Sequence, residues 1–452
     1  MNFEASWVAE VTGGTVGPMA ASAASGVVKD SRDATAGSMY VALIGERLDG
    51  HAFVADAAAA GAAFHLVSEP VAYPHVLVDD TSVALADLAR AHLRRLRADG
   101  DITVVGITGS VGKTTTKDLL RFLLEDALIP VGSYNNHIGL PITVLRADAD
   151  TRYLVLEMGA NGRGHIEFLT RIAPPDIAVV LAVGQAHLGE YEGIDDVAAA
   201  KAEIVAGAAD GATAILNSDD PRVAAMAANA EKVVTFGMGA ADVRATDVRT
   251  ERGCARFDIH TDNDRVSVAL NLVGEHHVYN ALAAATVARQ CGRTLEEIAS
   301  GLAEARPLSA HRMALSERSD GVRILDDSYN ASPESMKAAM RALVDVADGG
   351  RSVAVIGEML EMGAHSIAAH DELGHLAVRL GIDRLTVVGP GAKPAYEAAV
   401  REGSWGDEAT YVATIEEARA QLDTLLARGD TVLVKASHGS GLWRLADELV
   451  GE

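Results

Sequence analysis

The stretch GITGSVGKTT at residues 106–115 decides the fold of the middle of this chain. An apolar run at residues 102–105 precedes it and a helical pattern over residues 117–126 follows, so the predicted order is strand, glycine loop and helix. Glycines let several backbone N–H groups face one anion, and the N-terminus of the helix adds partial positive charge. In such a loop Lys113 reaches terminal phosphates and the Thr114 hydroxyl holds magnesium. The residues expected to bind the nucleotide here are Gly109, Ser110, Gly112, Lys113, Thr114 and Thr115.

One position departs from the strict phosphate-loop pattern. That pattern has a glycine, four further residues and then Gly-Lys, whereas Ile107 stands at the first glycine position. The alternative is an ordinary glycine turn with a solvated lysine. Nucleotide binding is the preferred interpretation, because a strand precedes the loop and a helix follows it.

Length and composition indicate a multi-domain α/β protein. A chain of 452 residues is too long for one core, so two to four domains are expected. Much of the 49% hydrophobic content is alanine, which suits alanine-rich helices packed on Val, Ile and Leu strands. Cys254 and Cys291 form neither a disulfide framework nor a metal-finger spacing. No signal segment or long charge-free apolar run is evident, so we expect a cytoplasmic protein without membrane insertion.

The net charge argues against one class of partner. Lys and Arg number 39 and Asp and Glu number 63, which gives a formal charge of −24. Affinity for nucleic acid comes from neutralising phosphates, so a nucleic-acid partner is not expected. Small anions can still bind in local cradles.

Three domains are expected, at residues 1–99, 100–312 and 313–452. In the first, strands are predicted at 39–44, 63–67 and 76–78, and helices at 54–61 and 83–96. In the second, buried parallel strands are predicted at 102–105, 153–156, 177–182 and 214–216, antiparallel strands at 255–259 and 266–272, and helices at 278–291 and 295–303. In the third, a doubly wound sheet is predicted from strands at 323–325, 352–356, 385–388 and 431–434 and helices at 332–346, 367–380, 392–402 and 415–427.

Polar side chains follow several of these strands. Glu157 ends one strand, and His187 lies just past the next. A carboxylate at the end of a strand parallel to the phosphate-loop strand is placed to hold magnesium, and the alternative is a surface glutamate. A loop histidine alone is more often structural, but here His187 becomes a candidate metal ligand. Asp327 belongs to a further cluster that follows the strand at 323–325.

Other candidates carry little signal by themselves. Lys201 is an ordinary lysine in an alanine-rich helix, and Asn280 begins a helix where it could read a base or only cap. The N-terminal segments KDSRD at 29–33 and GERLDGH at 45–51 place basic side chains in turns. Arginine grips phosphate with two parallel hydrogen bonds, so these turns suit anion recognition, although each could be a solvated turn.

Taken in order, these motifs resemble the Mur ligases over nearly the whole chain. The resemblance rests on TGSxGKTT at 108–115, NNxIGxP at 135–141, EMGA at 157–160, AH at 186–187, AKxEI at 200–204 and DSYN at 327–330. The N-terminal turns, EMGA and DSYNASP further resemble the member that joins D-alanyl-D-alanine to a UDP-N-acetylmuramoyl-tripeptide.

The resemblance implies a role for each domain. The first domain would hold the UDP end of the substrate, the second ATP with two magnesium ions, and the third the incoming dipeptide. It implies Lys113, Glu157, His187 and Lys201 as catalytic residues, with Thr114, Glu157, His187 and a carbamoylated Lys201 as metal ligands. It implies nucleotide contacts for Asn280, Arg312 and Asp327, and substrate contacts for Ser31, Arg32, Arg47, Asp49, His51, Asn136, Tyr329 and Asn330. ATP would activate a carboxylate as an acyl phosphate, which the dipeptide amine then attacks, and we expect a monomer.

One residue departs from the family pattern, and other functions stay open. His438 stands in KASHG at 435–439, where an arginine is common in the family, so the contact at this corner is open. Rival functions are another Mur-type or folylpolyglutamate-type amide ligase, a nucleotide-regulated binding module, and a simple phosphate-loop kinase or NTPase. The third residue of the tripeptide, diaminopimelate or lysine, is also open.

Overall fold

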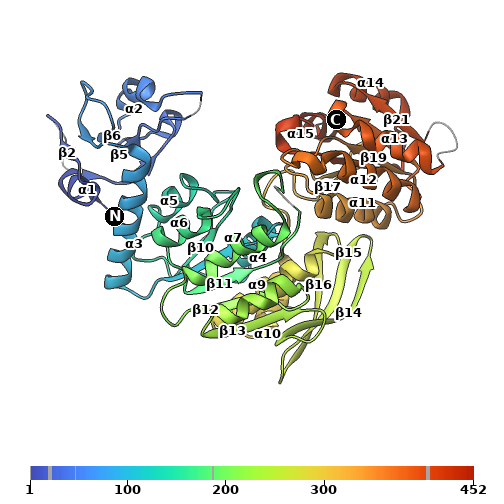
Figure 1. Ribbon diagram of the computed structural model, residues 1–452, viewed down its shortest axis with the longest axis horizontal. Helices are drawn as coiled ribbons and strands as arrows, with labels where there is room; N and C mark the ends of the chain where they lie inside the picture. The colour runs from blue at the N-terminus through green and yellow to red at the C-terminus, as the bar shows by residue number, and fades with distance from the viewer. Residues whose placement is uncertain (1, 19–22, 46, 186–187, 404–407, 452) are drawn as a thin grey trace.

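The computed structural model describes residues 2–18, 23–45, 47–185, 188–403 and 408–451. Three lobes follow one another along the chain, and each contains one large β-sheet. The N-terminal and C-terminal lobes lie apart, at opposite sides of the central lobe (Figure 1). No described helix is long and apolar enough to cross a membrane.

The N-terminal lobe is built on a five-stranded sheet in the order β2-β7-β6-β5-β4. The strands are β2 (Thr15–Val16), β4 (Gly26–Val28), β5 (Ser38–Val41), β6 (Phe64–Val67) and β7 (His75–Leu77), with a separate β1 (Phe3–Glu4) and β3 (Ala23–Ala24) pair. The helices are α1 (Ala5–Thr12), α2 (Val54–Ala59) and α3 (Thr81–Asp99). The three predicted strands and two predicted helices are confirmed, although β5 ends three residues earlier than the apolar run predicts.

Helix α3 joins the N-terminal lobe to the central lobe. It begins where the Asp80 carboxylate accepts the N–H groups of Ser82 and Val83, which satisfies two otherwise unpaired donors. Near its end, the ring of His92 is hydrogen-bonded to the carbonyl of Ala147 at 2.9 Å. Burial lowers the pKa of His92, so the ring is neutral and rigidly held at this junction.

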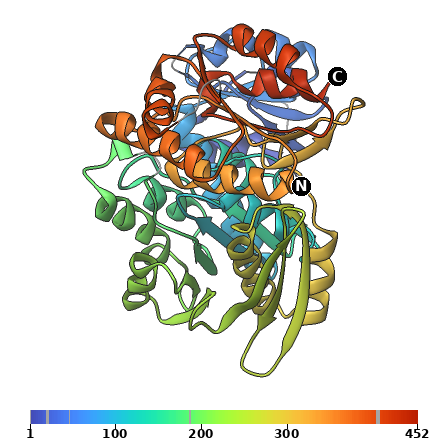
Figure 2. The same cartoon turned by 90° about the vertical axis from the view of Figure 1, so that its right-hand side faces the viewer.

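The central lobe has a nine-stranded sheet in the order β16-β15-β14-β13-β12-β11-β8-β10-β9. The strands are β8 (Thr103–Thr108), β9 (Ala127–Leu128), β10 (Tyr153–Glu157), β11 (Ile177–Val180), β12 (Thr213–Asn217), β13 (Lys232–Gly237), β14 (Val243–Glu251), β15 (Cys254–His260) and β16 (Arg265–Val273). The predicted parallel and antiparallel strands are confirmed, and β9, β13 and β14 are additional. Strands β14 to β16 extend away from the C-terminal lobe (Figure 2).

The helices of the central lobe cover both faces of this sheet. They are α4 (Lys113–Leu120), α5 (Gly139–Val144), α6 (His165–Ile172), α7 (Ile194–Ala206), α8 (Pro221–Ala225), α9 (His277–Gln290) and α10 (Leu295–Glu304). All five alanines of α9 are buried, because small side chains let the helix lie close to the strands.

The helix predicted at residues 117–126 is wrong in its extent. Helix α4 begins at Lys113, directly after the glycine loop, and ends at Leu120. Beyond it, the N–H groups of Phe122 and Leu123 donate to carbonyls three residues earlier, so the last turn tightens. Asp126 then adopts a φ of 51°, which stops any helix.

The C-terminal lobe is a doubly wound sheet in the order β17-β18-β22-β19-β20-β21. Its strands are β17 (Ala314–Glu317), β18 (Arg323–Asp326), β19 (Ser352–Ile356), β20 (Arg384–Val388), β21 (Ala409–Val412) and β22 (Thr431–Lys435). Its helices are α11 (Pro333–Ala347), α12 (Ser366–Arg379), α13 (Lys393–Glu402), α14 (Ile415–Leu425) and α15 (Trp443–Val450). Every strand and helix predicted here is confirmed, and the edge strands β17 and β21 and helix α15 are additional.

Candidate active site

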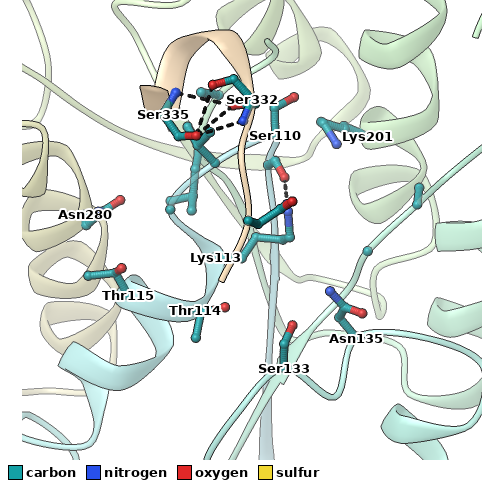
Figure 3. Close-up of a pocket in the computed structure, with 18 of the residues that line it drawn as sticks. Ser110, Lys113, Thr114, Thr115, Ser133, Asn135, Lys201, Asn280, Ser332 and Ser335 are labelled. Atoms are coloured by element: carbon teal, nitrogen blue, oxygen red, sulfur yellow. Dashed lines mark hydrogen bonds between the residues drawn. The ribbon is translucent and has the colours of Figure 1, made fainter. Parts of the chain in front are cut away.

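A cavity of about 1250 Å³ lies between the central and C-terminal lobes, and the start of α3 reaches its rim. Its lining brings together most of the predicted site residues: Gly109, Ser110, Gly112, Lys113, Thr114, Thr115, Asn136, Lys201, Asn280, Arg312, Asp327, Tyr329 and Asn330. The side chains labelled in Figure 3 come from the glycine loop, the start of α4, residues 133–135, α7, α9 and the start of α11.

The glycine loop has the geometry of a phosphate cradle. Strand β8 continues through Ile107, which is fully buried, so the turn starts later than in the strict pattern. Gly112 has a φ of 87° and packs against the side-chain oxygen of Asn280, so a Cβ at this position would collide with it. The N–H of Gly184 donates to the Ser110 hydroxyl at 2.8 Å, which ties the loop to the segment after β11.

A chain of hydrogen bonds links the two lobes beneath the loop. Arg312 Nη2 donates to Thr114 Oγ1 at 3.3 Å, and that hydroxyl donates to Glu157 Oε2 at 3.2 Å. The Ser133 hydroxyl donates to the same carboxylate oxygen, also at 3.2 Å. Arg312 precedes the C-terminal sheet, so this chain holds the start of that lobe against the glycine loop.

The residues around Glu157 suit a divalent cation. The carboxylate is 1% exposed, and its Oε1 atom accepts no hydrogen bond from a described residue. A buried carboxylate with one oxygen free of hydrogen bonds, beside a hydroxyl, is a donor set that hard cations prefer. The described residues contain no group of three His, Cys, Asp or Glu side chains that could hold a metal by itself. His187, the other predicted ligand, lies outside the described residues.

Two lysines, the half-buried Lys113 and the buried Lys201, face this site with lowered pKa values. Enclosure lowers the pKa of Lys113 to about 8, with Glu157 opposing the shift and Arg312 adding to it. Lys201 is 4% exposed, and burial lowers its pKa to about 7, with a smaller contribution from Lys113. Neither a hydrogen bond nor an ion pair joins the Lys201 amine to another described residue. At pH 8 this amine is largely neutral, so it is chemically competent to react with carbon dioxide.

The start of α9 forms another wall. Asn280 is buried and donates through Nδ2 to His277 Nδ1 at 3.0 Å. Burial lowers the pKa of His276 to about 4, with Lys435 adding to the shift and Asp327 opposing it. Burial also lowers the pKa of His277, so both rings are neutral, and the nitrogens of His276 can form hydrogen bonds to an uncharged group such as a base.

The C-terminal lobe contributes a buried ion pair. Lys435 Nζ donates to Asp327 Oδ2 at 2.5 Å and to the Asn330 carbonyl at 2.7 Å. Arg312 lies over the ring of Tyr329, with the guanidinium carbon 4.1 Å from the ring centroid. These contacts order the segment after β18, whose side chains face the cavity.

The sequence left open which contacts His438 makes, and in the structure its ring joins an aromatic stack. Its ring is stacked on Trp443 with a centroid distance of 5.7 Å and lies 5.5 Å from Tyr329. His438 itself is exposed and does not line the cavity.

The N-terminal candidates lie apart from the cavity. The side chain of Arg32 is 86% exposed and pairs with Asp30, and Arg47 is exposed in the turn before Asp49. His51 accepts the backbone N–H of Ser68 at Nε2 and is bonded through Nδ1 to Asp49. Ser31 begins a short 3-10 turn and does not line the cavity either. These residues therefore lie in the N-terminal lobe, away from the residues that line the cavity.

Several lining residues were not assigned a role from the sequence, among them Lys435, Ser133 and Asn135. Lys435 ends strand β22, so the strand-end argument that selected Glu157 would also have found it. Ser133 and Asn135 lie in the loop before α5; Asn135 belongs to the NNxIGxP motif, whereas no motif includes Ser133. Asn136 was selected, and its Oδ1 accepts the N–H groups of Ile138 and Gly139, so it also caps α5.

Three family models match the chain. The Mur ligase family, catalytic domain, matches residues 24–93; the Mur ligase middle domain matches residues 107–288; and the Mur ligase, glutamate ligase domain, matches residues 311–438. Together they span the three lobes.

Full-length relatives agree with these models. The UDP-N-acetylmuramoyl-tripeptide–D-alanyl-D-alanine ligase of Mycobacterium tuberculosis is 42% identical, over 98% of this chain and 97% of its own length. The enzyme of that name from Escherichia coli is 34% identical, over 92% of this chain and 91% of its own length.

Solved structures show the same arrangement of domains. MurF from Acinetobacter baumannii superposes with a TM-score of 0.89 at 31% identity and covers 100% of this chain and 99% of its own. MurF ligase from Thermotoga maritima, solved in complex with ADP, gives 0.80 at 30% identity and covers 94% and 96%. The glycine loop, the strand-end carboxylates and this similarity along the whole length agree, and the chain belongs to the Mur ligase family.

Proposed function

We propose that this chain is an ATP-dependent ligase that adds D-alanyl-D-alanine to UDP-N-acetylmuramoyl-tripeptide, which makes the pentapeptide precursor of peptidoglycan. One observation carries the proposal: the phosphate cradle and a buried lysine of lowered pKa, Lys201, line a single cavity that the C-terminal lobe completes, and the buried carboxylate of Glu157 lies directly behind the lining residue Thr114. The full-length relatives from Mycobacterium tuberculosis and Escherichia coli, which are ligases of that name, support it.

The proposed reaction requires that negative charge on its reactants be neutralised. A carboxylate of the tripeptide attacks the terminal phosphate of ATP to give an acyl phosphate and ADP. The neutral amine of the dipeptide then attacks the acyl carbon, so an amide bond forms and inorganic phosphate and a proton are released. Both partners of the first step are anions, so Lys113 and the backbone N–H groups of the loop lower its barrier by holding the transferring phosphate. Magnesium, when bound, supplies further positive charge at those oxygens. Thr114, Glu157, His187 and carbamoylated Lys201 are the residues we assign to two such ions.

Other residues position the substrates. Asn280, Arg312 and Asp327 are assigned to the nucleotide, and Asn136, Tyr329 and Asn330 to the substrate near the reacting groups. Ser31, Arg32, Arg47, Asp49 and His51 are assigned to the UDP end. In this scheme residues 1–99 hold UDP, residues 100–312 hold ATP and residues 313–452 bring the dipeptide.

Lys201 is assigned a carbamate because its environment suits one. A free ammonium at this buried position would be repelled by Lys113 and by bound magnesium. Addition of carbon dioxide converts the cation into an anionic oxygen ligand and removes the conflict. We further propose that the enzyme acts as a monomer in the cytoplasm, where ATP is available.

The test is phosphate release with purified protein, ATP, magnesium and a panel of UDP-muramoyl peptides with amino acids or dipeptides. The expected result is release only when UDP-muramoyl-tripeptide and D-alanyl-D-alanine are both present. Release with a single amino acid as acceptor would instead indicate another Mur-type or folylpolyglutamate-type ligase. Release with ATP alone would indicate a simple NTPase.

A further inference from the structure

One carboxylate of the C-terminal lobe faces the cavity with an unused oxygen. Glu334 lies in the first turn of α11, between the two residues of the capping box, Ser332 and Ser335. Its Oε1 atom accepts the backbone N–H of Gln185 from the central lobe at 2.9 Å. Its Oε2 atom is buried and accepts no hydrogen bond from a described residue.

The surroundings place this carboxylate beside the phosphate cradle. A Cβ at Gly184 would lie 3.0 to 3.3 Å from the carboxylate atoms of Glu334, so the backbone there is in direct contact with them. Gly184 also donates its N–H to the hydroxyl of Ser110, in the glycine loop. Two short contacts therefore separate Glu334 from the loop that would hold the transferring phosphate.

An unpartnered buried carboxylate oxygen is costly, so a ligand that fills the cavity should satisfy it. A phosphate group cannot satisfy this oxygen, because phosphate and carboxylate are both anions and repel each other. The proposed magnesium ligands Thr114, Glu157 and Lys201 belong to the central lobe, whereas Glu334 belongs to the lobe proposed to bring the dipeptide. An ammonium group offers three donors and the opposite charge.

We propose that Glu334 binds the ammonium of the incoming D-alanyl-D-alanine and orients it towards the activated carboxylate. This inference rests on the function proposed above. It explains why Gly184 has no side chain, since a larger residue would push the carboxylate out of the cavity. The proposal also gives the N-terminus of α11 a role in recognising D-alanyl-D-alanine, in addition to its contact with the central lobe.

The variant E334Q removes the negative charge of residue 334 but can keep its hydrogen bond to the N–H of Gln185. Glutamine keeps a side-chain oxygen that can accept the N–H of Gln185, so the contact between lobes persists, but the negative charge is lost. The expected result is a rise of roughly ten- to a hundredfold in the KM for D-alanyl-D-alanine, the range for one charge-assisted hydrogen bond. The KM values for ATP and the UDP substrate should stay unchanged. The matched control is D345N, the same chemical change at an exposed position of α11, which should leave all three KM values unchanged.

A second measurement tests recognition of the ammonium directly. N-Propionyl-D-alanine has the shape of the dipeptide but lacks the amine. Wild type should bind it much more weakly than the dipeptide, and E334Q should bind both about equally. An unchanged dipeptide KM in E334Q, or equal increases for all three substrates, would overturn the assignment of Glu334. Absence of dipeptide-dependent phosphate release by wild type would overturn the proposed function and this inference with it.

Discussion

The ammonium of Lys117 lies 3.7 Å from Oε1 of Glu157, and both side chains are almost completely buried. The same ammonium donates to the carbonyls of Pro130 and Gly132 at 2.6 and 2.9 Å and lies 2.8 Å from Asp118 Oδ1. Lys117 therefore joins the proposed metal carboxylate to the loop that carries Ser133. It is a positioning residue, since it does not line the cavity itself.

Replacement of Lys117 by methionine should reduce both stability and turnover. The volume is kept, but two buried carboxylates lose their counter-charge, which costs about 3–5 kcal/mol for a broken buried pair. Thermal unfolding should show the loss, and the magnesium concentration needed for half-maximal activity should rise because Glu157 is less well held. The matched control is Lys232→Met, at an exposed lysine, which should change neither quantity. Unchanged stability and magnesium dependence in Lys117→Met would contradict this role.

Lys113→Ala should abolish ligation while the fold is retained. The lysine supplies charge to the transferring phosphate only if the glycine loop is the catalytic cradle, and loss of one such donor costs roughly a hundred- to a thousandfold in kcat. The circular dichroism spectrum of the variant should match that of the wild type, whereas its substrate-dependent phosphate release should be lost. A variant with near wild-type turnover would remove the loop from catalysis.

Arg47→Ala should raise the KM for the UDP substrate far more than the KM for ATP. Arg47 is exposed in a turn of the N-terminal lobe and does not line the cavity, so its effect should be confined to the distant end of the long substrate. A rise of roughly tenfold corresponds to ~1.4 kcal/mol of lost binding. Arg94→Ala, at another exposed arginine of the same lobe, is the control. Equal effects on the two KM values, or none, would exclude Arg47 from UDP recognition.

Much of this fold could be predicted because buried parallel strands are continuous apolar runs. Strands β8, β10 and β11 were found in this way, and the polar residues at their ends followed from the direction of the strands. The edge strands β17 and β21 were missed because their burial is partial, so their apolar pattern is interrupted.

The site was predictable only where a residue sits at a strand end or in a loop motif. Lys201 shows the limit: its helix pattern is ordinary, and its burial beside Lys113 comes from the way α7 packs near β8, which no local spacing encodes. Lys117 was missed for a similar reason, since the sequence pattern predicts an exposed side chain for a lysine at this position of a helix. Glu334 depends on a contact between residues 185 and 334, which only the tertiary fold brings together.

The central and C-terminal lobes should close further when nucleotide and UDP substrate bind. Contact between them in this structure includes the N–H of Gln185 with Glu334 and the N–H of Gly189 with the carbonyl of Glu361. Glu157 and Asp327 must serve one nucleotide from two lobes, and exclusion of water protects an activated carboxylate. Small-angle scattering should show a smaller radius of gyration with a non-hydrolysable ATP analogue and UDP-muramoyl-tripeptide than without ligands. An unchanged scattering profile at saturation would count against closure.

Lys201 should be carbamoylated in the active enzyme, and its titration should be visible in stability. Burial lowers its pKa from 10.5 to about 7 in the folded chain. Between pH 7 and 10.5 the unfolded chain binds a proton that the folded chain has released, so stability should rise with pH across this window. Lys201→Met should remove that part of the pH dependence in metal-free protein, whereas Lys232→Met should not.

The neutral amine is also the form that reacts with carbon dioxide, so labelling with ¹³C-bicarbonate should give a carbamate NMR signal that grows between pH 6 and pH 8. The signal should be absent from Lys201→Ala, which should be nearly inactive because the proposed metal site then lacks an anionic oxygen ligand. A short carboxylic acid in the buffer should partly restore its activity by supplying such an oxygen. Full activity of Lys201→Ala, or an unmodified lysine in wild type that stays equally active without bicarbonate, would show that the carbamate is not part of the mechanism.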